Sequence, residues 1–166
     1  MRRVARLEAG GVEIVTNCNV GVDVSFAALR GKHDAVLIAT GVYKKRGLNA
    51  PGSGLSGIVQ ALDYLTTSNH LNFGDDVDLS TLDAKDKKVV VIGGGDTAMD
   101  GVRTAIRQGG DSVKCLYGRD RENMPGSMRE TQNAEEEGVQ FDWLRAPKAF
   151  TGEDTVTGVR AAKMRL

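Results

Sequence analysis

The chain has 166 residues, about one domain in length, and its 22 Lys and Arg residues balance its 22 Asp and Glu residues. A formal charge of zero argues against a general nucleic-acid binder, which needs a clustered basic excess. No apolar run approaches the roughly 20 residues of a membrane span, and no signal peptide is visible. The two cysteines form no CxxC pair, which argues against a zinc site, an iron–sulfur site or a disulfide framework within this chain. We therefore expect a cytoplasmic protein that binds neither membrane nor nucleic acid.

The first half of the sequence predicts few regular elements. A helix is expected at residues 2–9, a strand at 12–16 and a weak helix at 23–29. Residues 35–39 are all apolar, which predicts a strand in a sheet that is covered on both faces.

Residues 43–57 read as a loop that is rich in glycine. The apolar spacing from Ile58 to Leu65 predicts a helix with Ser56 as its N-cap. The polar stretch 66–88 reads as a linker. We place the domain boundary near residue 85, so that residues 1–85 and 86–166 form separate parts.

The second half predicts an alternation of strands and helices. Strands are expected at 89–92, 112–117 and 139–144, the last ended by Pro147. Helices are expected from Asp96 to Gly109 and from a capping box at Ser127–Glu130 to Gly138. A β-hairpin or meander is expected over 150–166. The β-α-β-α-β pattern favours a parallel sheet with flanking helices, and hence an α/β, Rossmann-like fold.

The stretch from Gly93 to Ala98 fits the G-x-G-x-x-G/A pattern of dinucleotide-binding folds, directly after an apolar strand and at the start of an amphipathic helix. Gly93 permits the tight turn, and Gly95 lets a pyrophosphate approach the backbone. The helix then offers free N–H groups to phosphate, so Gly93, Gly95, Asp96 and Thr97 are the candidate nucleotide-binding residues. The alternative is a Gly-rich turn without a ligand.

The second strand should end beside the adenosine ribose of such a nucleotide. Arg119 and Arg121 follow that strand and are candidates to bind a 2′-phosphate, with Asp120 pointing outward. A solvated loop of mixed charge is the alternative.

No residue of the sequence is assigned as a catalytic acid or base, or as a metal ligand. His33 and His70 are expected at the surface and Cys115 in the core. The three residues Glu135, Glu136 and Glu137 are expected on a solvated helix face.

These motifs together resemble a known family. The segments that carry the resemblance are VVVIGGGDTAMD (89–100), SVKCLYGRDRENMPGS (112–127), AEEEGV (134–139), DAVLIATG (34–41) and the Pro-Gly segment at 51–57. They resemble the small (beta) subunit of bacterial glutamate synthase, within the wider group of two-dinucleotide-binding flavoprotein reductases.

The resemblance implies an FAD/NAD(P)-binding fold and an internal part of a longer subunit. Residues 1–85 would then belong to the FAD-binding domain and its linker, and residues 86–166 to an incomplete NAD(P)H-binding domain. Thr40 and Gly41 would lie near the flavin. Iron–sulfur cysteines and the first Gly-rich loop would lie outside this chain, so we expect it to retain no FAD and to be inactive by itself.

The function implied is hydride transfer from NADPH to FAD, which feeds electrons to a large subunit that makes glutamate from 2-oxoglutarate and glutamine. NADH is the alternative donor, because Gly118 stands where the family commonly has an arginine. The alternative functions are another reductase of the same group and a non-catalytic nucleotide-binding fragment. Unpaired strands in residues 1–85 predict a homo-dimer or a larger assembly.

Overall fold

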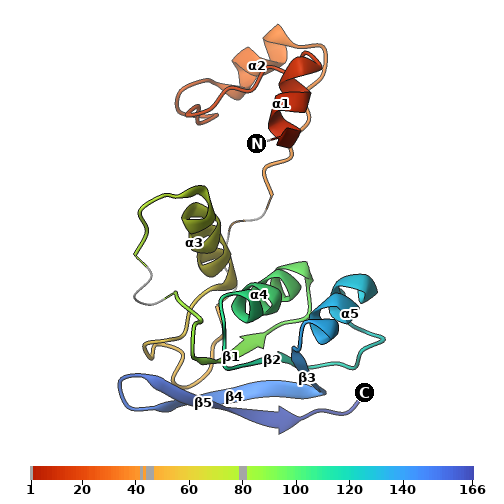
Figure 1. Cartoon of the computed structure of the whole chain (residues 1–166). Helices are drawn as coiled ribbons and strands as arrows, with labels where there is room; N and C mark the ends of the chain where they lie inside the picture. Colours follow the sequence, from red (N-terminus) through yellow and green to blue (C-terminus); the bar gives the residue numbers. More distant parts are fainter. Residues whose placement is uncertain (1, 42, 44–46, 79–81) are drawn as a thin grey trace. The chain divides into compact units, whose positions relative to one another are not determined.

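The computed structural model describes residues 2–41, 43, 47–78 and 82–166 (Figure 1). The chain divides into two compact units, Met1–Val42 and Tyr43–Leu166. The contacts thus divide the chain well before residue 85. The division of the chain by function stays a prediction.

The first unit contains two short helices, α1 (Arg2–Ala9) and α2 (Phe26–Lys32). The predicted helix at 2–9 is confirmed. The second helix begins at Phe26 because the hydroxyl of Ser25 accepts a hydrogen bond from the backbone N–H of Ala28, at 3.1 Å, and so caps it.

Neither strand that we predicted in this unit is formed. Residues 12–16 and 35–39 have no regular structure, and none of residues 2–41 is buried. The prediction fails because an apolar strand needs a hydrogen-bonded neighbour, and residues 2–41 contain no strand to pair with. Thr40 and Gly41 follow the second of these runs as exposed coil.

The second unit is an α/β fold, as predicted. Strands β1 (Lys88–Ile92), β2 (Ser112–Tyr117) and β3 (Gln140–Trp143) form a parallel sheet in the order β1-β2-β3. Helix α4 (Asp96–Arg107) connects the first two strands, and α5 (Met128–Glu136) connects the last two. The predicted β-α-β-α-β pattern is therefore confirmed.

The predicted hairpin is also confirmed, but it begins earlier. Strands β4 (Arg145–Gly152) and β5 (Val156–Lys163) pair in antiparallel fashion. Pro147 thus lies inside β4 and does not end β3. It is tolerated there because the ladder is irregular between Pro147 and Ala149, where the missing N–H disrupts little.

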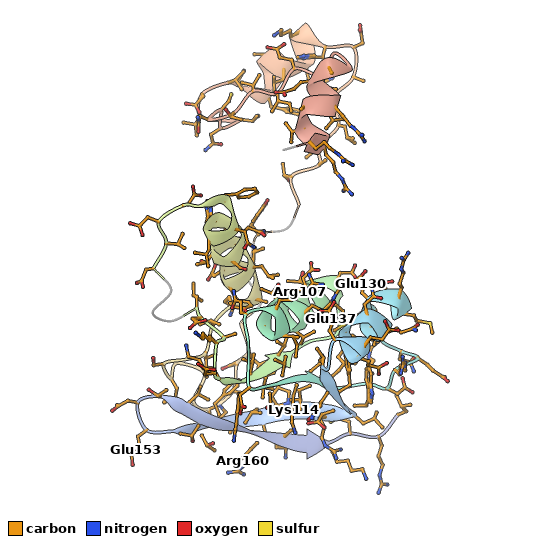
Figure 2. The ribbon with its side chains drawn as sticks, viewed as in Figure 1. Arg107, Lys114, Glu130, Glu137, Glu153 and Arg160 are labelled. Carbon is orange, nitrogen blue, oxygen red and sulfur yellow. The ribbon has the colours of Figure 1, made fainter. Side chains whose placement is uncertain are left out.

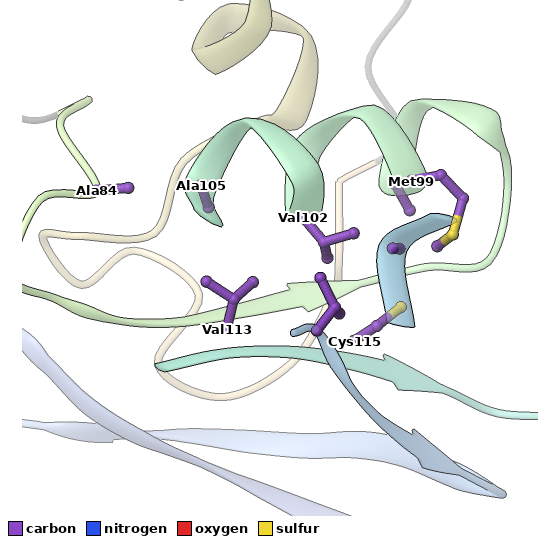
Figure 3. Close-up of a cluster of buried hydrophobic side chains, with 9 residues drawn as sticks. Ala84, Met99, Val102, Ala105, Val113 and Cys115 are labelled. Atoms are coloured by element: carbon purple, nitrogen blue, oxygen red, sulfur yellow. The ribbon is translucent and has the colours of Figure 1, made fainter. Parts of the chain in front are cut away.

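The second unit has three layers. Helix α4 packs on β1, β2 and α5, while β4 contacts β2 (Figure 1). The hairpin lies on the side of the parallel sheet away from α4 (Figure 3). The core fills the space between α4 and the sheet, and its largest fully buried side chains are Met99, Val102, Val113 and Cys115 (Figure 3).

Helix α3 (Ala61–Phe73) differs from its prediction at both ends. It begins after Gln60, because the backbone of Ser56 is instead hydrogen-bonded to the hairpin, accepting from Val156 N at 2.9 Å. It also continues to Phe73, through the first part of the predicted linker. Packing on α4 accounts for this extension: Ser68 is buried, and its hydroxyl accepts from Nε2 of Gln108, the residue that follows α4, at 3.3 Å. Residues 79–81 of the predicted linker lie outside the described residues.

Ionic contacts join α4 to α5 (Figure 2). Glu137 Oε1 accepts from Arg103 Nη2 and from Arg107 Nη2, each at 2.7 Å. Arg103 also pairs with Glu130, so the capping box predicted with Ser127 is not formed. The hydrogen bond from Arg103 is the largest influence on Glu137, and together with Arg107 it lowers the pKa of that carboxyl.

The prediction of a solvated acidic face is confirmed for Glu136, which is exposed, and is wrong for Glu135 and Glu137, which are partly buried. Glu135 pairs with Arg121, and Glu136 accepts a hydrogen bond from Gln132. Local sequence could not reveal these pairs, because most of the partners come from other elements that are brought close only by folding.

Candidate nucleotide site

The turn between β1 and α4 has the backbone that the Gly-rich pattern predicts. Gly93 has a φ of 146°, which disfavours any residue with a side chain. Its N–H donates to Leu116 O at 3.1 Å and so fixes the turn to β2. A Cβ at Gly93 would lie 3.5 Å from the Cβ of Ala98, so the strand and the helix approach closely here.

The other two glycines of the turn have opposite surroundings. A Cβ at Gly94 would lie 2.6 Å from the ring of Tyr117, so this ring occupies the space that a side chain at position 94 would need. A Cβ at Gly95 would meet nothing within 4 Å. The backbone at Gly95 is therefore open to an approaching group, at the N-terminus of α4.

The same position offers hydrogen-bond donors. Among the described residues, no acceptor is found for the backbone N–H groups of Gly95, Asp96 and Thr97. Free N–H groups at the positive end of a helix dipole attract anions. An open backbone with such donors fits the pyrophosphate of a dinucleotide.

Arg119 lies just beyond the C-terminal end of β2. Its carbonyl accepts from Leu144 N at 3.0 Å, which fixes its backbone, while its side chain is exposed. Within the described part of the chain, no carboxylate pairs with its guanidinium. The ends of β1 and β2 are neighbours in the parallel sheet, so Arg119 and the Gly-rich turn lie at the same edge.

Arg121 has a different position. Its guanidinium donates to both carboxylate oxygens of Glu135, at 3.0 and 2.8 Å. Asp120 accepts from the backbone and side-chain nitrogens of Asn123, at 2.9 and 2.7 Å, and so shapes the loop. Its expected outward orientation stays untested, because these hydrogen bonds lie within its own loop. In this structure Arg119 is better placed than Arg121 for a 2′-phosphate.

Sequence reasoning missed a second loop that lies against the Gly-rich turn. Gly126 N donates to Gly94 O at 2.8 Å, and Ser127 N donates to Asp96 Oδ1 at 3.2 Å. The Pro125-Gly126 pair in the sequence signals a turn, but nothing in it indicates what that turn contacts. Asp96 is thus engaged with this loop, while its expected contact with a nucleotide stays a prediction.

Cys115 lies in β2, next to the Gly-rich turn, and is not a nucleophile candidate. Its side chain is buried, its Sγ donates to Gly93 O at 3.2 Å, and burial raises the pKa of the thiol to about 12. The predicted core position is confirmed. His33 and His70 are exposed, as predicted.

Within residues 2–41, 43, 47–78 and 82–166, no helix is both long and apolar enough to cross a bilayer. The same residues contain no group of three or more His, Cys, Asp and Glu side chains arranged to hold a metal ion.

Comparison with known proteins places these features in a wider context. The family described as "Pyridine nucleotide-disulphide oxidoreductase" matches residues 3–165. The chain is 68% identical, over 99% of its length, to a "Putative glutamate synthase [NADPH] small chain" of Cereibacter sphaeroides. It is 61% identical, also over 99% of its length, to the "Glutamate synthase [NADPH] small chain" of Azospirillum brasilense. The chain spans only 40% and 35% of these relatives.

Solved structures show a similar fold. FprA of Mycobacterium tuberculosis in complex with NADPH matches 88% of this chain and 49% of its own, with a TM-score of 0.63 and 18% identity. The thioredoxin reductase of Lactococcus lactis matches 74% of this chain and 36% of its own, with a TM-score of 0.52 and 21% identity. At such identities the likeness concerns the fold alone, which is the Rossmann-like fold of FAD/NAD(P)-binding reductases.

Proposed function

Because the chain belongs to the pyridine nucleotide-disulphide oxidoreductase family, we propose that it provides the NADPH site of a flavin-dependent oxidoreductase. The observation that carries this proposal is the open backbone at Gly95 beside free N–H groups of α4. When bound, the nucleotide supplies a hydride for transfer to FAD. The protein binds and orients it.

Each part of the site has a proposed role. Gly93 and Gly95 let the backbone approach the pyrophosphate, and the N–H groups of Asp96 and Thr97 donate to it. Arg119 binds the 2′-phosphate of NADPH. Arg121 takes part only if its pair with Glu135 opens.

We propose that the whole protein is a glutamate synthase small chain, because relatives that carry this name match nearly all of this chain. Electrons from NADPH would pass through FAD to a large subunit in the cytoplasm, where glutamate is made from 2-oxoglutarate and glutamine. Residues 1–85 then belong to the FAD-binding domain, with Thr40 and Gly41 near the flavin. Residues 86–166 form part of the NAD(P)H-binding domain.

The test of the nucleotide site is calorimetric titration of the chain with NADPH and NADH. A guanidinium can donate paired, charge-assisted hydrogen bonds to a 2′-phosphate, which a ribose hydroxyl cannot match. Such a bond contributes about 1.5–3 kcal/mol. We therefore expect Arg119→Ala to weaken NADPH binding by roughly 10- to 150-fold and to leave NADH binding nearly unchanged.

Two further variants sharpen this test. Arg129 is an exposed arginine in the first turn of α5, so Arg129→Ala removes the same charge and should leave NADPH binding unchanged. Gly118→Arg should tighten NADPH binding selectively. If Arg119→Ala weakens both nucleotides equally, Arg119 does not bind the 2′-phosphate.

The alternatives are another reductase of the same group and a non-catalytic nucleotide-binding fragment. A gene for a glutamate synthase large subunit beside this one would favour the proposed function over another reductase. We expect the purified chain to be colourless and to oxidise no NADPH. Stoichiometric yellow flavin on this chain would contradict that expectation.

We also propose that the chain associates with a second copy of itself. Leu37 and Ile38 are 89% and 68% exposed, and exposed apolar groups of this kind favour association. Sedimentation at tens of micromolar should show a dimer or a larger species. A monodisperse monomer would contradict this.

A further inference from the structure

The loop from Arg119 to Ser127 is called the 119–127 loop below. The C-terminal end of this loop contacts the Gly-rich turn. Gly94 and Gly126 are both buried, and Gly126 N donates to Gly94 O at 2.8 Å. A Cβ at Gly126 would lie 2.9 Å from Gly94 O and 3.5 Å from the carbonyl carbon of Gly95. The two backbones therefore touch, with no room for a side chain between them.

A second hydrogen bond fixes the same end of the loop. The Asp96 carboxylate accepts from Ser127 N at 3.2 Å. Asp96 is the first residue of α4, next to the open backbone of Gly95. The loop is thus attached on both sides of the point at which a pyrophosphate would approach.

The beginning and middle of the loop are also held. Arg119 O accepts from Leu144 N at 3.0 Å, and Asp120 closes a turn on Asn123. The ring of Tyr117 covers Gly94 and meets the ring of Trp143 edge to face, at 6.5 Å. The loop that begins with Arg119 is therefore held in shape by contacts within the protein itself.

We propose that the 119–127 loop positions the Gly-rich turn for a pyridine nucleotide, with Gly126 and Asp96 as its positioning residues. The hydrogen bonds from Gly126 and Ser127 hold the open backbone of Gly95 at a fixed spacing from Arg119. The pyrophosphate and the 2′-phosphate of one nucleotide must be bound at both places at once, so this spacing determines affinity. The inference rests on the proposed nucleotide site.

The first test compares two glycine substitutions. Neither Gly126 nor Gly118 has a positive φ, so alanine suits both backbones. At Gly118 the nearest atom to an added Cβ is Arg145 O, at 3.9 Å, which is an ordinary contact. We expect Gly126→Ala to weaken NADPH and NADH binding at least tenfold, because the methyl group separates the loop from the turn. Gly118→Ala should stay within about twofold of the wild type.

The second test separates the hydrogen bond of Asp96 from its charge. Asp96→Ala and Asp96→Asn both remove the charge, but only asparagine keeps an oxygen that can accept from Ser127 N. We expect the alanine variant to bind NADPH about three- to tenfold more weakly than the asparagine variant. Both should unfold at the same urea concentration, because Asp96 and Ser127 are exposed.

Binding can be followed by calorimetry and by the fluorescence of Trp143, the only tryptophan. Equal affinities for the two glycine variants, or for the two Asp96 variants, would overturn the inference while the nucleotide site itself stands. A wild-type chain that binds neither nucleotide would overturn the proposed function, and this inference with it. If Gly126→Ala does not fold, the Asp96 pair alone decides.

Discussion

Similar apolar sequences adopt different conformations in the two units of the chain. Residues 35–39 of the first unit and residues 89–92 of strand β1 in the second are both short apolar runs followed by glycine within two residues. The first run is exposed coil, whereas β1 pairs with β2 along its whole length. An apolar run can therefore enter a sheet, but it forms a strand only where a neighbouring strand hydrogen-bonds to it.

The contrast extends to the packing of side chains. The second unit fully buries Met99, Val102, Val113 and Cys115, while none of residues 2–41 is buried. A segment without a core cannot offset its loss of conformational entropy by burying apolar area.

The largest expected effect concerns the two cysteines, one in each unit. Cys18 is exposed, whereas Cys115 is buried and its thiol has a pKa of about 12. At pH 8 we expect one thiol per chain to react rapidly with an aromatic disulfide reagent. The second should react slower by a factor of about 10³ or more, because it requires local unfolding.

The matched variants identify each thiol in this reaction. Cys18→Ser should remove the fast phase and Cys115→Ser the slow one. If both thiols of the wild type react rapidly, Cys115 is accessible to the reagent and the core of the second unit is not closely packed.

A pair of truncations compares the cores directly. Met99→Ala removes a fully buried side chain, and we expect it to lower the free energy of unfolding by about 2–5 kcal/mol. Leu37→Ala removes a side chain that is 89% exposed, and its effect should be within about 0.5 kcal/mol. Urea unfolding followed by far-UV circular dichroism, which reports the helices of both units, measures both. Similar losses would show that Leu37 is packed in solution.

The ionic contacts of the second unit predict a dependence on pH. The arginines lower the pKa of Glu137 in the folded state. Its stabilising contribution is therefore present above the unfolded pKa of glutamate, about 4.3, and is lost as the pH falls through the lower folded value. Glu137→Gln should cost about 1 kcal/mol at pH 7, since the pair is partly screened by solvent. The gap from the wild type should narrow as the pH falls below the unfolded pKa and disappear below the lowered folded pKa, and a gap that does not narrow with acidification would rule out this role.

The smallest effect is a gain in stability. Gly101 lies inside α4, and a Cβ there would meet only the methyl groups of Val91, at 3.9 and 4.0 Å. Gly101→Ala should therefore raise the free energy of unfolding by about 0.5–1 kcal/mol, because alanine favours the helix. In contrast, Gly94→Ala should destabilise the chain, since its Cβ would fall 2.6 Å from the ring of Tyr117. Thermal unfolding of both variants checks the pair.

The sequence by itself determined the features that depend on local pattern. The strand 112–117 has the predicted bounds, and the turn at Gly93–Gly95 has the predicted strand before it and helix after it. Period and glycine placement are properties of neighbouring residues, so they can be read without the fold. The candidate site at Gly93, Gly95 and Arg119 came from such patterns.

Only the tertiary structure decided which residues meet across elements. It left residues 35–39 without a partner strand, extended α3 through packing on α4, and paired Arg121 with Glu135. It also placed Gly126 on Gly94, a contact between positions 32 residues apart. Such contacts depend on the fold of the whole chain, and the local propensity of a segment does not indicate which distant segment it will contact.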